Sequence, residues 1–97
     1  MTTEGSCRAD VWLWRARLFK TRALSARVIE EGRVRLLRAG AQTRLDKASR
    51  PLRPGDGLVM ALGGRLIAIR VEALGERRGP ASEAQALYSD LPPPGPD

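Results

Sequence analysis

The sequence contains no histidine and only one cysteine, Cys7. Without histidine there is no imidazole for a nucleophile pair, a general base or a zinc site, which excludes most familiar catalytic schemes. The carboxylates of Asp46, Asp56 and Glu72 fall in turn-like or strand-like contexts without a pairing for acid-base work. We therefore expect no enzymatic activity, no metal and no cofactor.

A secretory signal and an apolar run of about 18 residues, the length of a membrane helix, are also missing. A single cysteine cannot form an internal disulfide. These absences predict a cytoplasmic protein without a membrane interaction. Its 97 residues are enough for one small domain with its own core.

Positive charge is abundant, with 17 Lys and Arg residues against 11 Asp and Glu residues and a net charge of +6. Residues 1–53 contain 13 of the cations and five of the acidic residues, so the positive surface belongs to the N-terminal half. Fifteen of the cations are arginines, whose planar fork binds phosphate through two hydrogen bonds. The pattern favours a nucleic acid as partner, although a genome rich in G and C also uses arginine freely.

Two helices joined by a tight corner are predicted in the N-terminal half. Asp10 is a candidate N-cap for the first helix, which should run to about Phe19. Thr21 is a candidate N-cap for the second helix, which should end at Gly32. Tryptophans in the first helix could stack on bases, but their apolar spacing favours the core, more clearly for Trp12 than for Trp14.

The corner between these helices carries Lys20, Thr21 and Arg22, and Arg17 lies on the same side of the first helix as Lys20. Unpaired N–H groups and the macrodipole attract anions to a helix N-terminus. The corner is therefore the best candidate phosphate site in the sequence. The alternative is an ordinary solvated charged turn.

After Gly32 the apolar residues recur at every second position. Val34 and Leu36 alternate with Arg33 and Arg35, which is typical of a strand with one apolar and one basic face. Residues 38–50 allow a short strand at 43–45, without a clear register.

The C-terminal half predicts a hairpin and a third helix. Gly63-Gly64 forms a two-residue loop between strands 57–62 and 65–74. A short amphipathic helix should start at Pro80 or Ser82 and continue to about Leu91. A proline-rich tail follows, which could be a ligand for a proline-recognition domain or a solubilising end.

Several short motifs together resemble the S-four-type RNA-binding domain family, over about residues 8–90. The motifs are Arg8-Ala-Asp10, Leu13, Lys20-Thr-Arg22, Ile29, Gly32-Arg-Val34, Lys47-Ala-Ser49 and Gly55-Asp56. A second set is similar to the small bacterial heat-shock branch of this family, which associates with the large ribosomal subunit. This set comprises Trp12-Leu-Trp14, Lys20-Thr-Arg22, Glu76-Arg-Arg-Gly-Pro-Ala-Ser-Glu-Ala84 and Leu87-Tyr88.

The resemblance implies an α+β fold, in which an N-terminal helix pair packs on a small, mostly antiparallel sheet. With the predicted C-terminal helix, this gives a single domain at residues 8–90, a flexible tail at 1–7 and a disordered proline-rich tail at 91–97.

The resemblance also implies non-catalytic binding of structured RNA. The partners that it implies are ribosomal RNA of the large subunit and subunits that carry tRNA under heat stress. The candidate RNA-binding residues, from the charge pattern and the resemblance together, are Arg8, Arg17, Lys20, Thr21, Arg22, Arg33, Arg35, Lys47 and Ser49. Arg27 stands one residue later than the family's arginine, about 100° around the helix, which leaves its RNA contact open.

Other functions remain as alternatives. The chain could be a protein interaction adaptor that uses its basic face and proline-rich tail. It could also be the binding part of an RNA-modifying enzyme, because this domain type is often attached to catalytic domains. We expect only weak DNA binding and a monomeric state.

Overall fold

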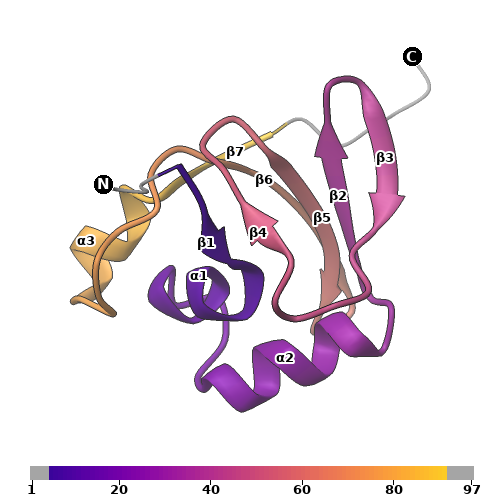
Figure 1. Ribbon diagram of the computed structural model, residues 1–97. Helices are drawn as coiled ribbons and strands as arrows, with labels where there is room; N and C mark the ends of the chain where they lie inside the picture. Colours follow the sequence, from indigo (N-terminus) through magenta and orange to yellow (C-terminus); the bar gives the residue numbers. More distant parts are fainter. Residues whose placement is uncertain (1–4, 92–97) are drawn as a thin grey trace.

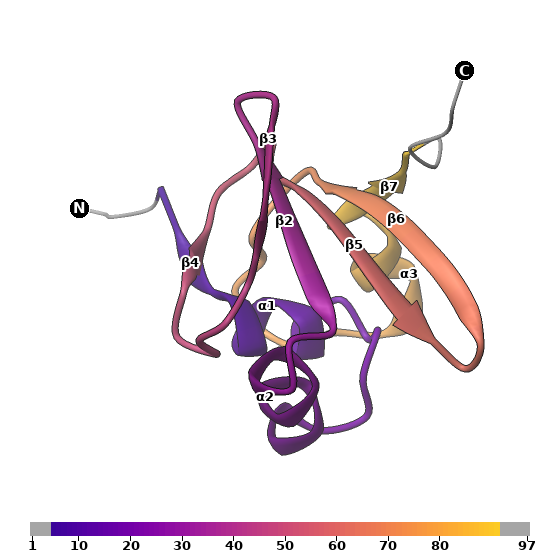
Figure 2. The same cartoon turned by 90° about the vertical axis from the view of Figure 1, so that its right-hand side faces the viewer.

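The computed structural model describes residues 5–91, so most of both predicted tails, at 1–4 and 92–97, lies outside the described residues. Helices α1 (Ala9–Arg15) and α2 (Arg22–Glu30) lie together below the strands (Figures 1 and 2). A five-stranded antiparallel sheet has the order β3-β2-β5-β6-β7. The remaining elements are β1 (Cys7–Arg8), β2 (Val34–Arg38), β3 (Ala41–Arg44), β4 (Pro51–Leu52), β5 (Gly57–Leu62), β6 (Arg65–Val71), α3 (Ala81–Gln85) and β7 (Tyr88–Asp90). The predicted α+β class is confirmed.

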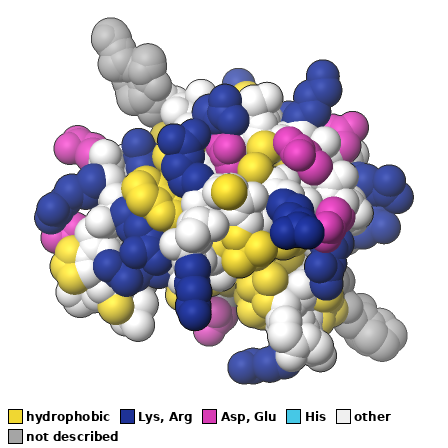
Figure 3. Space-filling model, turned by 90° about the horizontal axis from the view of Figure 1, so that it is seen from below, with side chains coloured by type: hydrophobic (Ala, Val, Ile, Leu, Met, Phe, Trp, Pro, Cys, Tyr) yellow, Lys and Arg dark blue, Asp and Glu magenta, His cyan; other side chains and the backbone are white. Residues whose placement is uncertain are grey.

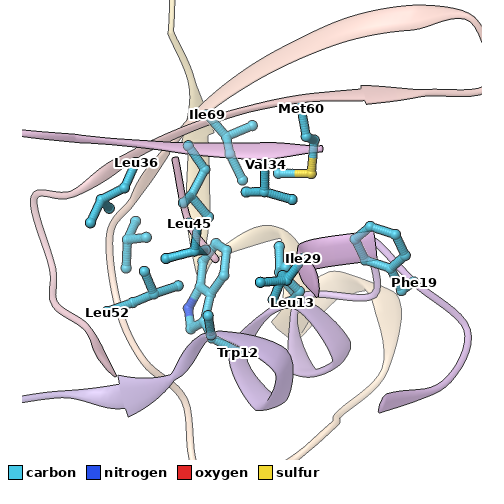
Figure 4. Packing of buried hydrophobic residues seen from close by; sticks show 14 of the residues in the cluster. Trp12, Leu13, Phe19, Ile29, Val34, Leu36, Leu45, Leu52, Met60 and Ile69 are labelled. Carbon is cyan, nitrogen blue, oxygen red and sulfur yellow. The ribbon is translucent and has the colours of Figure 1, made fainter. Parts of the chain in front are cut away.

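The core fills the space between the helix pair and the sheet. Trp12, Leu13 and Ile29 from the helices point toward apolar side chains of the strands (Figure 4). The indole N–H of Trp12 donates to the carbonyl of Ala73 at 2.8 Å, so its polar end is satisfied inside the core. The prediction that Trp12 belongs to the core is confirmed.

Helix α1 ends four residues before the predicted end at Phe19. Arg17 adopts a left-handed conformation with φ of 60°, and its N–H donates to the Trp14 carbonyl at 3.0 Å. The N–H of Leu18 donates to the Leu13 carbonyl at 3.1 Å, which completes a Schellman motif. The apolar spacing continues past this motif because Phe19 is also buried. Phe19 belongs to the corner between the helices and not to α1, so the spacing predicted a helix that was too long.

The start of α1 also differs from the prediction, because Asp10 lies inside the first turn and Arg8 occupies the N-cap position. The first N–H groups of α1 donate instead to the chain around Ser49: Ala9 N–H to the Arg50 carbonyl at 2.9 Å and Asp10 N–H to the Ala48 carbonyl at 3.1 Å. A distant segment thus satisfies two of the first N–H groups, while the Asp10 carboxylate accepts from a third, the Val11 N–H at 2.8 Å, from inside the helix rather than from the N-cap position.

Two tight hairpins shape the sheet. Gly63 and Gly64 both have positive φ, at 57° and 79°, and join β5 to β6 as predicted. Ala39 and Gly40 take the same two-residue turn between β2 and β3, with φ of 53° and 79°. The short strand expected at 43–45 is therefore β3, which begins two residues earlier.

The predicted C-terminal helix is wrong in its second half. Helix α3 has five residues, and Tyr88–Asp90 forms β7, paired with β6. The N–H of Leu91, assigned to the tail from the sequence, donates to the Ala68 carbonyl at 2.9 Å. The open edge of β6 offers unpaired backbone groups that outweigh the weak helical periodicity of this segment.

Two other strand assignments differ from the prediction, because they depend on contacts between residues that are distant in the sequence. Strand β6 ends at Val71 rather than at the predicted Leu74. Cys7, placed in the N-terminal tail by the sequence, pairs with Leu52 between β1 and β4. A two-residue pairing has no periodicity that a sequence could reveal.

Asp56 joins β2 to the turn that precedes β5. Its buried carboxylate accepts two hydrogen bonds from Arg38, at 2.9 and 2.6 Å, and one from the Arg53 N–H at 2.8 Å. Burial acts to raise the pKa of Asp56, but the hydrogen bonds from Arg38 and Arg53 and the attraction of their charges outweigh it and lower the pKa.

We expect Asp56→Ala to lower the free energy of unfolding by about 2–3 kcal/mol, because three donors lose a charged acceptor. Urea denaturation measures the change. Glu30→Ala, which removes an exposed carboxylate from α2, is the control and should cost less than about 0.5 kcal/mol. Equal effects of the two substitutions would contradict a structural role for Asp56.

The pH dependence of stability follows from the lowered pKa values of Asp10 and Asp56. A carboxylate with a lowered folded pKa contributes stability above its unfolded pKa of about 3.9 and loses it as pH falls through the folded pKa. With no histidine in the chain, urea midpoints should be flat from about pH 5 to pH 7 and should fall below about pH 4. A transition centred near pH 6.5 would contradict this assignment.

Candidate nucleic-acid interface

Arg8 is held at the start of α1 by Asp10. Its Nε and Nη2 donate to the two carboxylate oxygens at 3.0 and 2.9 Å. Burial acts to raise the pKa of Asp10, but hydrogen bonds from Arg8 and the Val11 N–H, with the attraction of Arg8 and Arg22, lower it overall. The Arg8 side chain stays half exposed, so a fixed, planar guanidinium faces solvent beside α1.

The loop between β3 and β4 packs on the same end of α1. The carbonyls of Ala48 and Arg50 accept the first N–H groups of the helix, as described above. Lys47 and Ser49, which alternate with them along the loop, are exposed. Two predicted contacts from the middle of the chain therefore lie on a loop that packs beside Arg8. Arg22 is near enough to Asp10 for its charge to lower the pKa of that carboxyl.

Thr21 caps α2 as predicted. Its hydroxyl oxygen accepts from the Leu24 N–H at 3.0 Å, and its carbonyl accepts from the Ser25 N–H at 3.2 Å. The N–H groups of Arg22 and Ala23, which lie between Thr21 and Leu24, have no acceptor within the helix. With Lys20 and Arg22 exposed on either side of Thr21, the corner has the donors and the charge that an anion needs.

Ser25 fixes this corner to α1. Its side chain is completely buried, and its hydroxyl lies 2.9 Å from the Asp10 carbonyl and 2.8 Å from the Arg22 carbonyl, so it can donate to either. The hydroxyl thus ties α2 to the residue that holds Arg8. Because the side chain is completely buried between the two helices, this contact also fixes how closely α2 approaches α1.

A second group of cations lies at the other end of α2. Arg35 on β2 is directly opposite Arg44 on β3, and both are exposed. The Arg44 side chain lies over Gly32, where its Cδ is 3.3 Å from the position a Cβ would take. Arg33 is also exposed and forms an ion pair with Glu31 at 3.3 Å. Sequence analysis missed Arg44 because the register of residues 38–50 was unclear.

Two other arginines have contacts within the protein. Arg17 donates from Nε to the Gly79 carbonyl at 2.7 Å and holds the 75–80 loop against α1, so its RNA contact stays a prediction. Arg27 forms an ion pair with Glu31 at 3.7 Å on the exposed side of α2. Neither residue is brought together with Arg8 by any contact described for residues 5–91.

Figure 3 views the molecule from below, on the side where α2 lies. Lys and Arg side chains are spread widely across this face, with fewer Asp and Glu side chains among them and an apolar area toward one side. We use the name α2 surface for Arg8, Lys20, Thr21, Arg22, Arg33, Arg35, Arg44, Lys47 and Ser49. Within residues 5–91, no group of three His, Cys, Asp or Glu side chains is placed to hold a metal ion. None of the helices in that range is both long and apolar enough to cross a bilayer.

Comparison with known proteins gives consistent relatives, although no protein-family model matches the chain. The heat shock protein 15 homolog of Haemophilus influenzae is 36% identical over 87 residues, which are 90% of this chain and 63% of that protein. Heat shock protein 15 of Escherichia coli K12 is 37% identical over 83 residues, which are 86% of this chain and 59% of that protein. The chain therefore spans about three-fifths of the length of these curated relatives.

A solved structure is similar as well. The trimeric structure of Vibrio cholerae heat shock protein 15 superimposes with a TM-score of 0.77 at 32% identity, covering 89% of this chain and 82% of that one. The likeness extends over both the helix pair and the sheet, because so large a share of each chain is aligned.

Arg35 and Arg44, which face each other across β2 and β3, allow a test of whether this surface trades stability for the binding of an anionic ligand. Like charges directly opposite in a sheet are destabilising, so we expect Arg44→Gln to raise the free energy of unfolding by about 0.2–1 kcal/mol in low salt. The same variant should bind a polyanion such as heparin more weakly. Urea denaturation and retention on heparin measure the two effects.

Arg65→Gln is the matched control, because Arg65 faces Leu62 rather than a cation. It should change stability little. If Arg44→Gln lowered stability, the two arginines would not repel each other measurably and the argument for this end of the surface would fail.

Proposed function

The chain belongs to the heat shock protein 15 family, an S-four-like family, and from this premise we propose that its α2 surface binds structured RNA without catalysis. The observation that carries the proposal is the corner at Thr21, where two exposed cations stand on either side of the residue that caps α2. The first N–H groups of a helix have no acceptor within it, so they are available to a ligand. Phosphate oxygens fit such donors, and arginine forks add bidentate contacts. The fixed guanidinium of Arg8 extends the same surface along α1.

We further propose ribosomal RNA of the large subunit as the target, in a cytoplasmic response to heat or stalled translation. This finer assignment follows from the resemblance to the ribosome-associated branch. Sedimentation of lysate through a density gradient, with and without heat stress, tests it. The protein should travel with free large subunits, and its absence from every ribosomal fraction would leave only general RNA binding.

A protein interaction adaptor is the alternative, because a basic face also suits an acidic protein. The proline-rich segment that this alternative uses lies largely outside the described residues. Pull-down after nuclease treatment separates the two functions, since partners held through RNA should disappear. Weak DNA binding is compatible with either function because phosphate contacts carry no sequence information.

We propose a monomer in solution, as expected from the sequence. A trimeric structure is described for the Vibrio cholerae protein. Light scattering of the purified chain across a range of concentrations distinguishes the two states.

Charge reversal at the corner tests RNA binding directly. We expect Lys20→Glu with Arg22→Glu to weaken binding to all structured RNAs and to reduce the slope of log affinity against log salt by about 1 for each lost phosphate contact. Filter binding at several salt concentrations gives both quantities. Circular dichroism should show an unchanged fold because both side chains are exposed.

The control is Arg65→Glu with Arg70→Glu, which changes the net charge equally at two exposed positions of β6. This control should retain most of the affinity. Equal losses in the two double variants would mean that net charge alone drives binding. A salt-insensitive affinity of the unaltered protein would contradict phosphate recognition altogether.

A further inference from the structure

An apolar groove runs between α2 and the tip of the β5–β6 hairpin, next to the Thr21 corner. Its volume is about 470 Å³, within the range of small-ligand sites. Figure 3 shows an apolar area on this face of the molecule. The apolar side chains that line the groove are Leu18, Phe19, Leu24, Val28, Ala61 and Leu62.

Leu24 is the exposed apolar wall of this groove. It is 40% exposed, one of two large hydrophobic residues that stand out from the surface of the described chain. Its position is fixed, because its N–H donates to the Thr21 hydroxyl that caps α2. Phe19, which also lines the groove, is buried at one end of the core (Figure 4), so it forms part of the groove floor.

Cations stand at the rim. Lys20, which precedes α2, and Arg33, which follows it, both line the groove, and no acidic residue does so within the described part of the chain. The helix between them has nine residues, which corresponds to about 13 Å at a rise of 1.5 Å per residue. A ligand that fits must present an apolar face to the floor and negative charge to both ends.

We propose that this groove binds an unpaired nucleobase of the RNA, with phosphates of the same strand on Lys20 and Arg33. The inference rests on the proposed RNA binding and adds what kind of RNA is selected. A base in a duplex is stacked and cannot reach the groove, whereas a base in a loop or bulge can turn outward and pack on apolar side chains. An acidic peptide would satisfy the same charges, but the adjacent anion site at Thr21 continues the path for a phosphate backbone.

Leu24→Ala tests the proposal by removing the exposed wall. The probe is an RNA hairpin with a single-stranded loop that carries one 2-aminopurine. We expect the affinity for this RNA to fall about fivefold, because the base loses the apolar surface that the Leu24 side chain offers it. The salt slope should not change, since no phosphate contact is lost. Binding of a fully paired duplex should be unaffected.

Two further variants make the result specific. Leu66→Ala removes the other exposed large hydrophobic residue, 63% exposed and outside the groove, and should bind like the unaltered protein. Leu24→Phe keeps an apolar wall and should restore the affinity and the fluorescence change of 2-aminopurine on binding.

The outcomes are distinguishable. Binding of the loop RNA by Leu24→Ala with unchanged affinity overturns the nucleobase site while leaving RNA binding intact. A selective loss of binding to an acidic amphipathic peptide, with RNA affinity unchanged, also overturns it in favour of a peptide groove. Failure of the unaltered protein to bind any RNA defeats the proposed function itself.

Discussion

Asp10 is the residue on which the arrangement of the N-terminal half depends. Each of its three polar groups holds a different part of the chain: the carboxylate binds Arg8, the N–H donates to Ala48, and the carbonyl accepts from Ser25. At 4% exposure Asp10 has little access to water, so its polar groups depend on partners within the protein. The contacts bring β1, the loop after β3 and α2 together, and with them most of the candidate RNA contacts.

The cations of this chain divide into those that build the fold and those that face solvent. Arg15 and Arg78 donate to backbone carbonyls of other segments, and Arg38 pairs with the buried Asp56. These arginines connect elements that a small core holds only weakly. The cations around α2 have fewer protein partners than these arginines. The net charge of +6 therefore does not show where on the surface positive charge is available to a ligand. Location relative to α2, rather than residue type, therefore defines the candidate interface.

Local signals allowed much of this structure to be predicted. The Thr21 cap and the Gly63-Gly64 hairpin each depend on a few adjacent residues, and both are present. Features that depend on distant partners could not be predicted: β7 exists because β6 has an open edge, and α1 begins where a loop some 40 residues later meets it. Arg44 was missed for the same reason, since only the strand register places it opposite Arg35.

The two proposals give affinity and selectivity for RNA separate physical origins on this surface. Phosphate contacts at the corner position a polyanion but do not distinguish one RNA from another. An apolar groove beside them contributes only when the ligand can offer an uncovered apolar face, which paired bases cannot. Because Thr21 fixes both the open N–H groups of α2 and the position of Leu24, the two elements keep a constant spacing. A rigid spacing of this kind favours RNA in which a turned-out base lies next to an exposed phosphate, and so favours folded over uniformly paired RNA.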